Sequence, residues 1–154
     1  MPDVAAVTGL NLQSSNEILK QQIALNNELS MAKYLHDYVE SEKTKEQLLP
    51  VNAGIKSTAI NEQITSYNTL LLKKNTLLAN SSVDNPIVAG LVEEVQSLRE
   101  VLLLSVNDLI ATLNIQLQNV NQEELAARKK LSNNPSQELY LLSSGRQQIP
   151  CSST

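Results

Sequence analysis

The residues that could take part in chemistry are few and lie far apart in this 154-residue chain. His36 is the only histidine and Cys151 the only cysteine, so an internal disulfide, a multi-histidine metal site and a cysteine–histidine pair close in sequence are all excluded. We interpret His36 as a histidine of a helix seam or surface, where histidines are common. The sequence therefore predicts no metal site.

Two pairs of adjacent carboxylates, Glu93-Glu94 and Glu123-Glu124, fall in stretches with a helical pattern. Adjacent residues on a helix point in different directions, so the two members of each pair do not converge on one substrate. The four glycines of the chain form neither a phosphate-binding loop nor a dinucleotide-binding fingerprint. We predict that the chain is not an enzyme, with no catalytic residues, no cofactor-binding residues and no cofactor.

Composition and charge narrow the possible partners. The net charge is −4 and the 12 basic residues do not gather into a stripe, which argues against nucleic-acid binding. No apolar run approaches the roughly 20 residues that cross a bilayer, so we predict no membrane span in this chain. Asn80-Ser81-Ser82 fits a glycosylation sequon. We interpret it as a turn.

Four tyrosines are the only aromatic residues, and Leu, Ile, Val and Ala must fill the interior. This composition is typical of long helices packed along a seam, and predicts an all-α protein. We expect residues 1–11 to be a frayed end and residues 12–47 to form the first helix. Ser14 and Glu17 are a possible capping box at its start. Its seam is Ile18, Leu25, Leu29, Ala32 and Val39.

Two further helices follow a break at residues 50–54. Spacings of three and four predict a helix over residues 57–80 and a longer one over 86–132, with Pro86 at the first position of the latter. The seam of the shorter helix is Ile60, Ile64, Tyr67, Leu71, Lys74 and Leu78. The seam of the longer helix is Leu91, Val95, Leu98, Leu102, Val106, Ile110, Leu113, Leu117, Val120, Glu124, Ala127 and Leu131.

These helices predict a long antiparallel helical hairpin, or coiled coil, that folds about Val83. Residues 12–47 and 57–80 would form the ascending leg, interrupted at residues 50–54, and residues 86–132 the descending leg. A return segment would occupy residues 136–148. Several leucines fall outside the seams and are candidates for self-association: Leu72, Leu77, Leu103 and Leu104. Gln22 and Gln116 either set the helix register or lie just off the seam.

Several blocks of sequence carry a resemblance to a known family. They are Leu48-Leu49-Pro50-Val51-Asn52-Ala53-Gly54-Ile55, Tyr67-Asn68 with Leu70-Leu71-Leu72 and Asn75-Thr76-Leu77-Leu78, Asn85-Pro86-Ile87-Val88, and Leu131-Ser132-Asn133-Asn134-Pro135-Ser136-Gln137-Glu138 followed by Arg146. Over roughly residues 12–149 the chain resembles the extracytoplasmic coiled coil of bacterial polysaccharide co-polymerases. The tyrosine autokinases of capsule and exopolysaccharide export in Bacteroidetes are the most similar branch.

The resemblance implies a larger parent protein. In that family two membrane-spanning helices flank a periplasmic part with an α/β base domain and a helical protrusion, and a cytoplasmic tyrosine kinase follows. This chain would correspond to the protrusion alone, on the periplasmic face of the inner membrane. It would support homo-oligomerisation, chain-length determination and contact with the export machinery. The family-like structural residues are Pro50, Asn52, Gly54, Asn85, Pro86, Pro135, Glu138 and Arg146.

The last residues depart from the family pattern. After Ile149 the chain reads Pro150-Cys151-Ser152-Ser153-Thr154, where the family continues with a charged and apolar helix. We interpret residues 150–154 as the product of a frameshift or a truncated gene. The alternative to the family reading is a generic coiled-coil adaptor, or a tether of the membrane-fusion type, with similar heptads.

Overall fold

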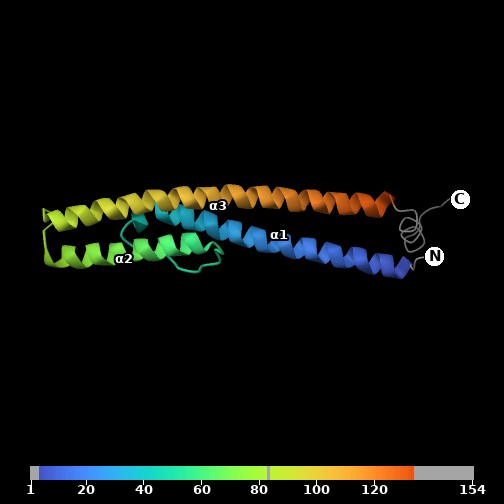
Figure 1. Ribbon diagram of the computed structural model, residues 1–154, viewed down its shortest axis with the longest axis horizontal. Coiled ribbons are helices and arrows are strands. Elements are labelled where there is room, and N and C mark those ends of the chain that lie inside the picture. Colours follow the sequence, from blue (N-terminus) through green and yellow to red (C-terminus); the bar gives the residue numbers. More distant parts are fainter. Residues whose placement is uncertain (1–3, 83, 134–154) are drawn as a thin grey trace. The chain divides into compact units, whose positions relative to one another are not determined.

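The computed structural model describes residues 4–82 and 84–133, and in these residues the chain is helical without a strand. It has three α-helices, α1 (Val4–Glu40), α2 (Thr58–Asn80) and α3 (Pro86–Asn133), and a short 3-10 helix η1 (Glu42–Thr44) (Figure 1). The prediction of an all-α protein is confirmed. The return segment expected at residues 136–148 and the tail at residues 150–154 lie outside the described residues.

Helix α1 differs from its expected bounds at both ends. It begins at Val4 rather than at residue 12, since Ala5, Ala6 and Leu10 favour a helix; this corrects the expected frayed end over residues 4–11. Ser14 therefore lies inside the helix and does not cap it. The helix ends at Glu40 rather than at residue 47, because Ser41 takes an extended conformation and its hydroxyl accepts a hydrogen bond from the Lys43 amide at 3.2 Å.

The two other helices begin at side-chain caps. The Ser57 hydroxyl accepts a hydrogen bond from the Ile60 amide at 3.2 Å at the start of α2. The Asn85 side chain accepts one from the Ile87 amide at 2.9 Å, and Pro86 is the first residue of α3, as expected. Both starts agree with the sequence pattern within one residue.

The chain divides into two compact units, Leu25–Ile115 and a second made of Met1–Ala24 with Gln116–Thr154. The core of the Leu25–Ile115 unit draws on all three helices and on the link between α1 and α2. It comprises Leu35, Val39, Leu49, Ile55, Ile60, Ile64, Tyr67, Leu71, Val95, Leu102 and Val106. The seam predicted for α2 is confirmed from Ile60 to Lys74, all five of whose members are buried. On α3, however, Arg99 is buried beside Val95 and Leu102, whereas Leu98 is only partly buried.

The interruption between α1 and α2 is longer than the expected break at residues 50–54 and has a different course. We call residues 41–57 the re-entrant segment, because its end returns to the middle of α1: the Lys56 amide donates a hydrogen bond to Glu28 Oε2 at 3.1 Å (Figure 1). Glu28 precedes the end of α1 at Glu40 by about 18 Å of helix. Helices α1 and α2 are therefore not joined end to end in this unit. They overlap beside α3.

The other unit contains the first part of α1 and the last part of α3. Leu117 and Val120 are buried in it, and a polar pair joins the two helices: Gln22 Nε2 donates a hydrogen bond to Asn121 Oδ1 at 2.8 Å. Gln22 is half-buried, whereas Gln116 is exposed. Of the two interpretations open for these glutamines, the seam position fits Gln22 and the off-seam position fits Gln116.

Helix α3 is long and apolar enough, by length and composition alone, to cross a membrane, with a mean hydropathy of 1.3 in an 18-residue stretch. The same helix carries the buried stripe that packs on α1 and α2 in the Leu25–Ile115 unit. Only 17% of that stretch is buried inside the structure. The absence of a membrane span stays a prediction.

Candidate functional site

Two asparagines of α2 hold the re-entrant segment through its backbone. Asn68 makes a two-point contact with Leu49: its Oδ1 accepts from the Leu49 amide at 2.8 Å and its Nδ2 donates to the Leu49 carbonyl at 2.9 Å. Asn61 accepts from the Asn52 amide at 3.2 Å and donates to the Ile55 carbonyl at 2.9 Å. These bonds replace the helical partners that the segment lacks. They fix its course along α2.

Three of the predicted site residues, Pro50, Asn52 and Gly54, lie together in this segment. Asn52 has φ 56° and Gly54 has φ 86°, in the left-handed region that asparagine tolerates and glycine favours. A Cβ on Gly54 would also lie 3.1 Å from Met31 Cγ on α1. The residue types of this motif are therefore explained by a turn packed closely on α1.

The other predicted site residues lie elsewhere. Asn85 and Pro86 cap and begin α3, so the structure does not bring them together with the turn at Pro50. Pro135, Glu138 and Arg146 lie outside the described residues. The roles visible for this set are structural, since the described members set turns and a helix start.

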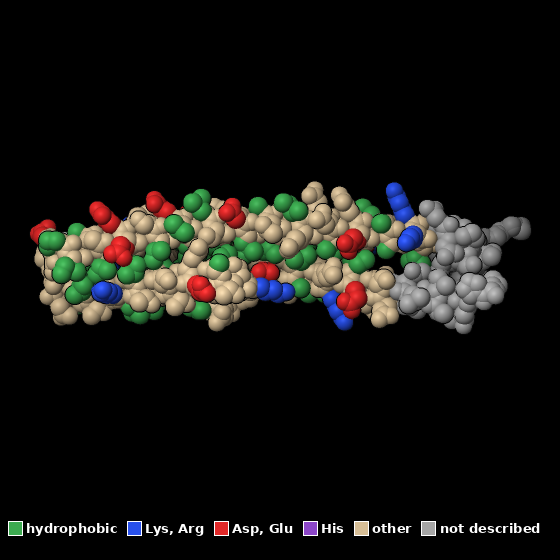
Figure 2. Space-filling model, in the orientation of Figure 1, with side chains coloured by type: hydrophobic (Ala, Val, Ile, Leu, Met, Phe, Trp, Pro, Cys, Tyr) green, Lys and Arg blue, Asp and Glu red, His purple; other side chains and the backbone are tan. Residues whose placement is uncertain are grey.

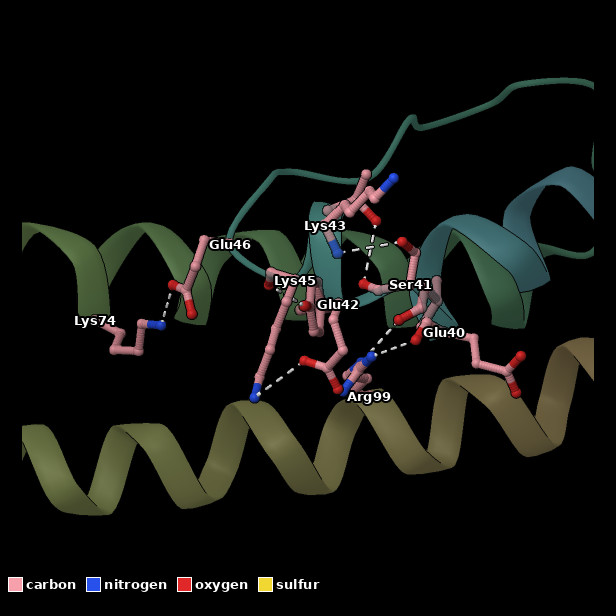
Figure 3. A network of polar contacts seen from close by, with 11 residues as sticks. Glu40, Ser41, Glu42, Lys43, Lys45, Glu46, Lys74 and Arg99 are labelled. Carbon is pink, nitrogen blue, oxygen red and sulfur yellow. Dashed lines mark hydrogen bonds and ion pairs between the residues drawn. The ribbon is translucent and has the colours of Figure 1, made fainter.

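Arg99 joins α3 to the end of α1. Its Nε donates to the Val39 carbonyl at 2.8 Å and its Nη2 donates to the Glu40 carbonyl at 2.9 Å (Figure 3). These carbonyls belong to the last turn of α1, where the helix has no donors of its own and where its dipole favours a cation. Arg99 is only 8% exposed. It therefore caps α1 from a neighbouring helix.

Next to Arg99, a second cation is buried between the re-entrant segment and α2. Lys74 forms an ion pair with Glu46 (Figure 3), and the Tyr67 hydroxyl donates to the Lys45 carbonyl at 3.3 Å. These residues border a cavity of about 330 Å³ in the Leu25–Ile115 unit. Its lining comprises Lys45, Glu46, Tyr67, Lys74, Leu78, Val92, Val95, Gln96 and Arg99. We call its polar residues Lys45, Glu46, Tyr67, Lys74 and Arg99 the polar joint. Leu78, Val92 and Val95 provide the apolar part of the lining.

Burial raises the pKa of Tyr67 above its ordinary value of 10.0, and nearby Glu46 and Tyr38 act in the same direction while Arg99 opposes them. The folded state thus favours the neutral phenol. The neutral phenol of Tyr67 contributes fully to the free energy of unfolding below about pH 10. This contribution is lost as the pH rises through the raised pKa, because Tyr67 ionises in the unfolded chain at a lower pH than in the folded chain.

We expect the free energy of unfolding of the native chain to fall more between about pH 8 and about pH 10.5 than that of Tyr67→Phe. Urea denaturation at the two pH values measures both changes. The phenylalanine variant keeps the ring in the core and removes only the titrating hydroxyl with its bond to Lys45. Equal losses in the two proteins would contradict the role given to Tyr67.

Of the residues first considered for chemistry, Cys151 lies outside the described residues. His36 is half-buried on α1 and contacts Asp37 at 3.2 Å and Glu40 at 3.8 Å. Glu124 pairs with Arg128 at 3.6 Å, and the Asn80 side chain donates to the Thr76 carbonyl at 3.2 Å. Within residues 4–82 and 84–133, no group of three or more His, Cys, Asp or Glu side chains is placed to hold a metal ion.

Sequence reasoning missed Glu28, Asn61 and Asn68, which hold the re-entrant segment, and Arg99, which caps α1. An asparagine that bonds a distant backbone has the same local pattern as one in solvent, so nothing in the sequence marks Asn61 or Asn68. The sequence does indicate that Arg99 is buried, through its spacing from neighbouring buried residues. It stands four residues after Val95 and three before Leu102, which is the spacing of a buried position.

Large apolar side chains are exposed on α2 and α3 of the Leu25–Ile115 unit. Leu72 is 51% exposed and Leu104 is 66% exposed, whereas Leu77 and Leu103, also expected outside the seams, are partly buried. Val101 and Ile115 are 46% and 58% exposed. Figure 2 shows apolar side chains on the visible face of α3, separated by scattered charged ones.

Comparisons with protein-family models, with curated proteins and with solved structures find no match for this chain. The features that bear on function are therefore the re-entrant segment with its polar joint and the exposed apolar residues of α3. The joint gives a fixed geometry to the Leu25–Ile115 unit.

Proposed function

We propose that the chain is a non-catalytic helical interaction segment, a long antiparallel hairpin of coiled-coil type that associates with copies of itself. The observation that carries this proposal is the exposed apolar residues on α3. Val101, Leu104 and Ile115 stand at positions that recur every three or four residues together with Asp108 and Ala111, and so belong to one stripe of the helix. Buried Leu102, Val106 and Leu113 form a separate stripe on the same helix.

The exposed stripe is apolar at Val101, Leu104, Ala111 and Ile115 and is interrupted by Asp108. The core of its own unit does not cover this stripe. Exposed contiguous apolar surface usually marks an interaction site, and a second helix is the partner that matches its spacing. Within the Leu25–Ile115 unit the first stripe is covered by α1, α2 and the re-entrant segment. The second stripe is the contact surface in this proposal.

In its wider context, we propose that this segment is the periplasmic protrusion of a polysaccharide co-polymerase with a tyrosine kinase elsewhere in the parent. The protrusion would support assembly, chain-length control and capsule or exopolysaccharide export through contact with the export machinery. Support comes from the motif residues Asn52, Gly54, Asn85 and Pro86. These residues carry the resemblance, and each occupies a turn or a helix start with a specific backbone requirement.

The alternative is a generic coiled-coil adaptor or a tether of the membrane-fusion type. Uninterrupted DNA sequence on both sides of this coding region distinguishes the two functions. Membrane-spanning segments and a Walker-type kinase in the same frame, with glycosyltransferase and export genes nearby, would support the co-polymerase. Their absence would favour the adaptor. The same sequence tests the proposed frameshift before residues 150–154.

The double variant Leu104→Gln with Ile115→Gln is expected to weaken self-association at least about tenfold, because two large apolar side chains leave the contact. Sedimentation velocity across a concentration series measures the change. Leu48→Gln is the matched control, since Leu48 is 45% exposed and lies in the re-entrant segment rather than on α3. Equal association of the native and double-variant chains would exclude this stripe as the contact.

A further inference from the structure

The cavity beside Arg99 has an excess of positive charge in a chain whose net charge is negative. Three basic side chains line it: Lys45, Lys74 and Arg99. Lys45 is paired with Glu42 and Lys74 with Glu46, which leaves Arg99 as the lining cation without a carboxylate partner among the described residues. The whole chain carries −4. A cavity lined mainly by one sign of charge concentrates ions of the opposite sign. The local charge therefore favours an anion.

Two of these cations are more than nine-tenths buried. Lys74 is 5% exposed and has Glu46 as its ion-pair partner, whereas Arg99 is 8% exposed and bonds only neutral carbonyls in the part of the chain that the structure describes. A buried charge without a full counter-charge is costly, and the dipole of α1 offsets this cost only in part. An anion in the cavity would supply the missing counter-charge for Arg99.

Donors remain for such an anion. The two bonds of Arg99 use Nε and Nη2, which leaves Nη1 without a hydrogen bond among the described residues. Lys45 Nζ forms an ion pair with Glu42 Oε2 at 3.7 Å, and the Lys45 side chain is 47% exposed (Figure 3). The site thus combines a fixed guanidinium with an ammonium group at its edge that can move toward a ligand.

The apolar residues of the lining indicate which kind of molecule could carry the anionic group. Leu78, Val92 and Val95 provide apolar surface, and the volume of about 330 Å³ is near the lower end for small-molecule sites. We propose that this cavity binds a small organic anion, with one carboxylate or phosphate group held by Arg99 and Lys45 and a short apolar body against the three aliphatic side chains. The proposal is independent of the self-association surface on α3.

Benzoate is a suitable probe, with benzyl alcohol as a neutral compound of similar shape and inorganic phosphate as an anion without an apolar body. Each is titrated into the full chain and followed by two-dimensional NMR. We expect saturable shifts from benzoate at Gln96, Val92, Val95 and the Arg99 side chain. Benzyl alcohol should bind more weakly because it lacks the anionic group, and phosphate should bind more weakly because it lacks the apolar body.

Lys45→Gln should weaken benzoate binding about three- to fivefold, as expected for one partly exposed charge. Lys43→Gln is the matched control, because Lys43 lies two residues away but does not line the cavity. Circular dichroism verifies that both variants are folded. Absence of saturable shifts, equal binding of benzyl alcohol, or equal loss in the two lysine variants would each overturn the proposal.

Discussion

Leu102→Asp is expected to unfold the Leu25–Ile115 unit. Leu102 is fully buried in the core that α1, α2 and α3 share. The change removes a leucine whose burial contributes about 1.5–3 kcal/mol and places a carboxyl group in an apolar site at a further cost of several kcal/mol. Small domains have about 5–15 kcal/mol of stability in total, so the expected loss is comparable to the whole. Circular dichroism and thermal melting measure it.

Two other variants on α3 serve as comparisons for the loss of stability in Leu102→Asp. Leu98→Asp should destabilise less than Leu102→Asp, because Leu98 is only partly buried, and Glu94→Lys should stay within about 0.5 kcal/mol of the native chain, because Glu94 is exposed. The order of the three melting temperatures tests the register of α3. Equal melting of Leu98→Asp and Leu102→Asp would show that the register is shifted.

Arg99→Met is expected to lower the free energy of unfolding by about 2–3 kcal/mol. The substitution keeps an unbranched apolar side chain and removes two charge-assisted hydrogen bonds to the carbonyls of Val39 and Glu40. Urea denaturation measures the loss. The last turn of α1 should also open more readily, since its carbonyls lose their partner.

The amide of Ser41 reports on that turn directly, because it donates to the Asp37 carbonyl at 3.0 Å. Its hydrogen exchange should be faster in Arg99→Met than in the native chain. Arg128→Met is the control on the same helix: its side chain is 73% exposed and pairs with Glu124, so a change below about 1 kcal/mol is expected. Equal effects of the two substitutions would contradict the capping role of Arg99.

Periodicity predicted the helices of this chain well where a buried stripe dominates. The buried positions of α2 and the starts of α2 and α3 follow from spacings of three and four and from Ser57, Asn85 and Pro86. The end of α1 was placed too late for a physical reason. The predicted end rested on the break at residues 50–54, and the sequence does not reveal that Ser41 leaves the helix earlier, because Arg99 from another helix satisfies the exposed carbonyls.

The course of the re-entrant segment could not be predicted for a similar reason. A proline and a glycine between two helical patterns indicate an interruption, but they do not indicate whether the chain continues or turns back. Contacts distant in sequence decide this: Glu28 with Lys56, and Asn68 with Leu49. The cavity depends on the same contacts. Its basic residues lie on three separate parts of the chain, and only the fold brings them together.

The proposal that this chain acts by self-association is tested most directly by sedimentation equilibrium of the native chain over a wide concentration range, with a thermal melt at each concentration. Because association stabilises the folded chain by mass action, the account predicts a mass that rises with concentration and a melting temperature that rises with it. A well-folded monomer at every concentration, with melting unaffected by dilution, would contradict self-association through these helices.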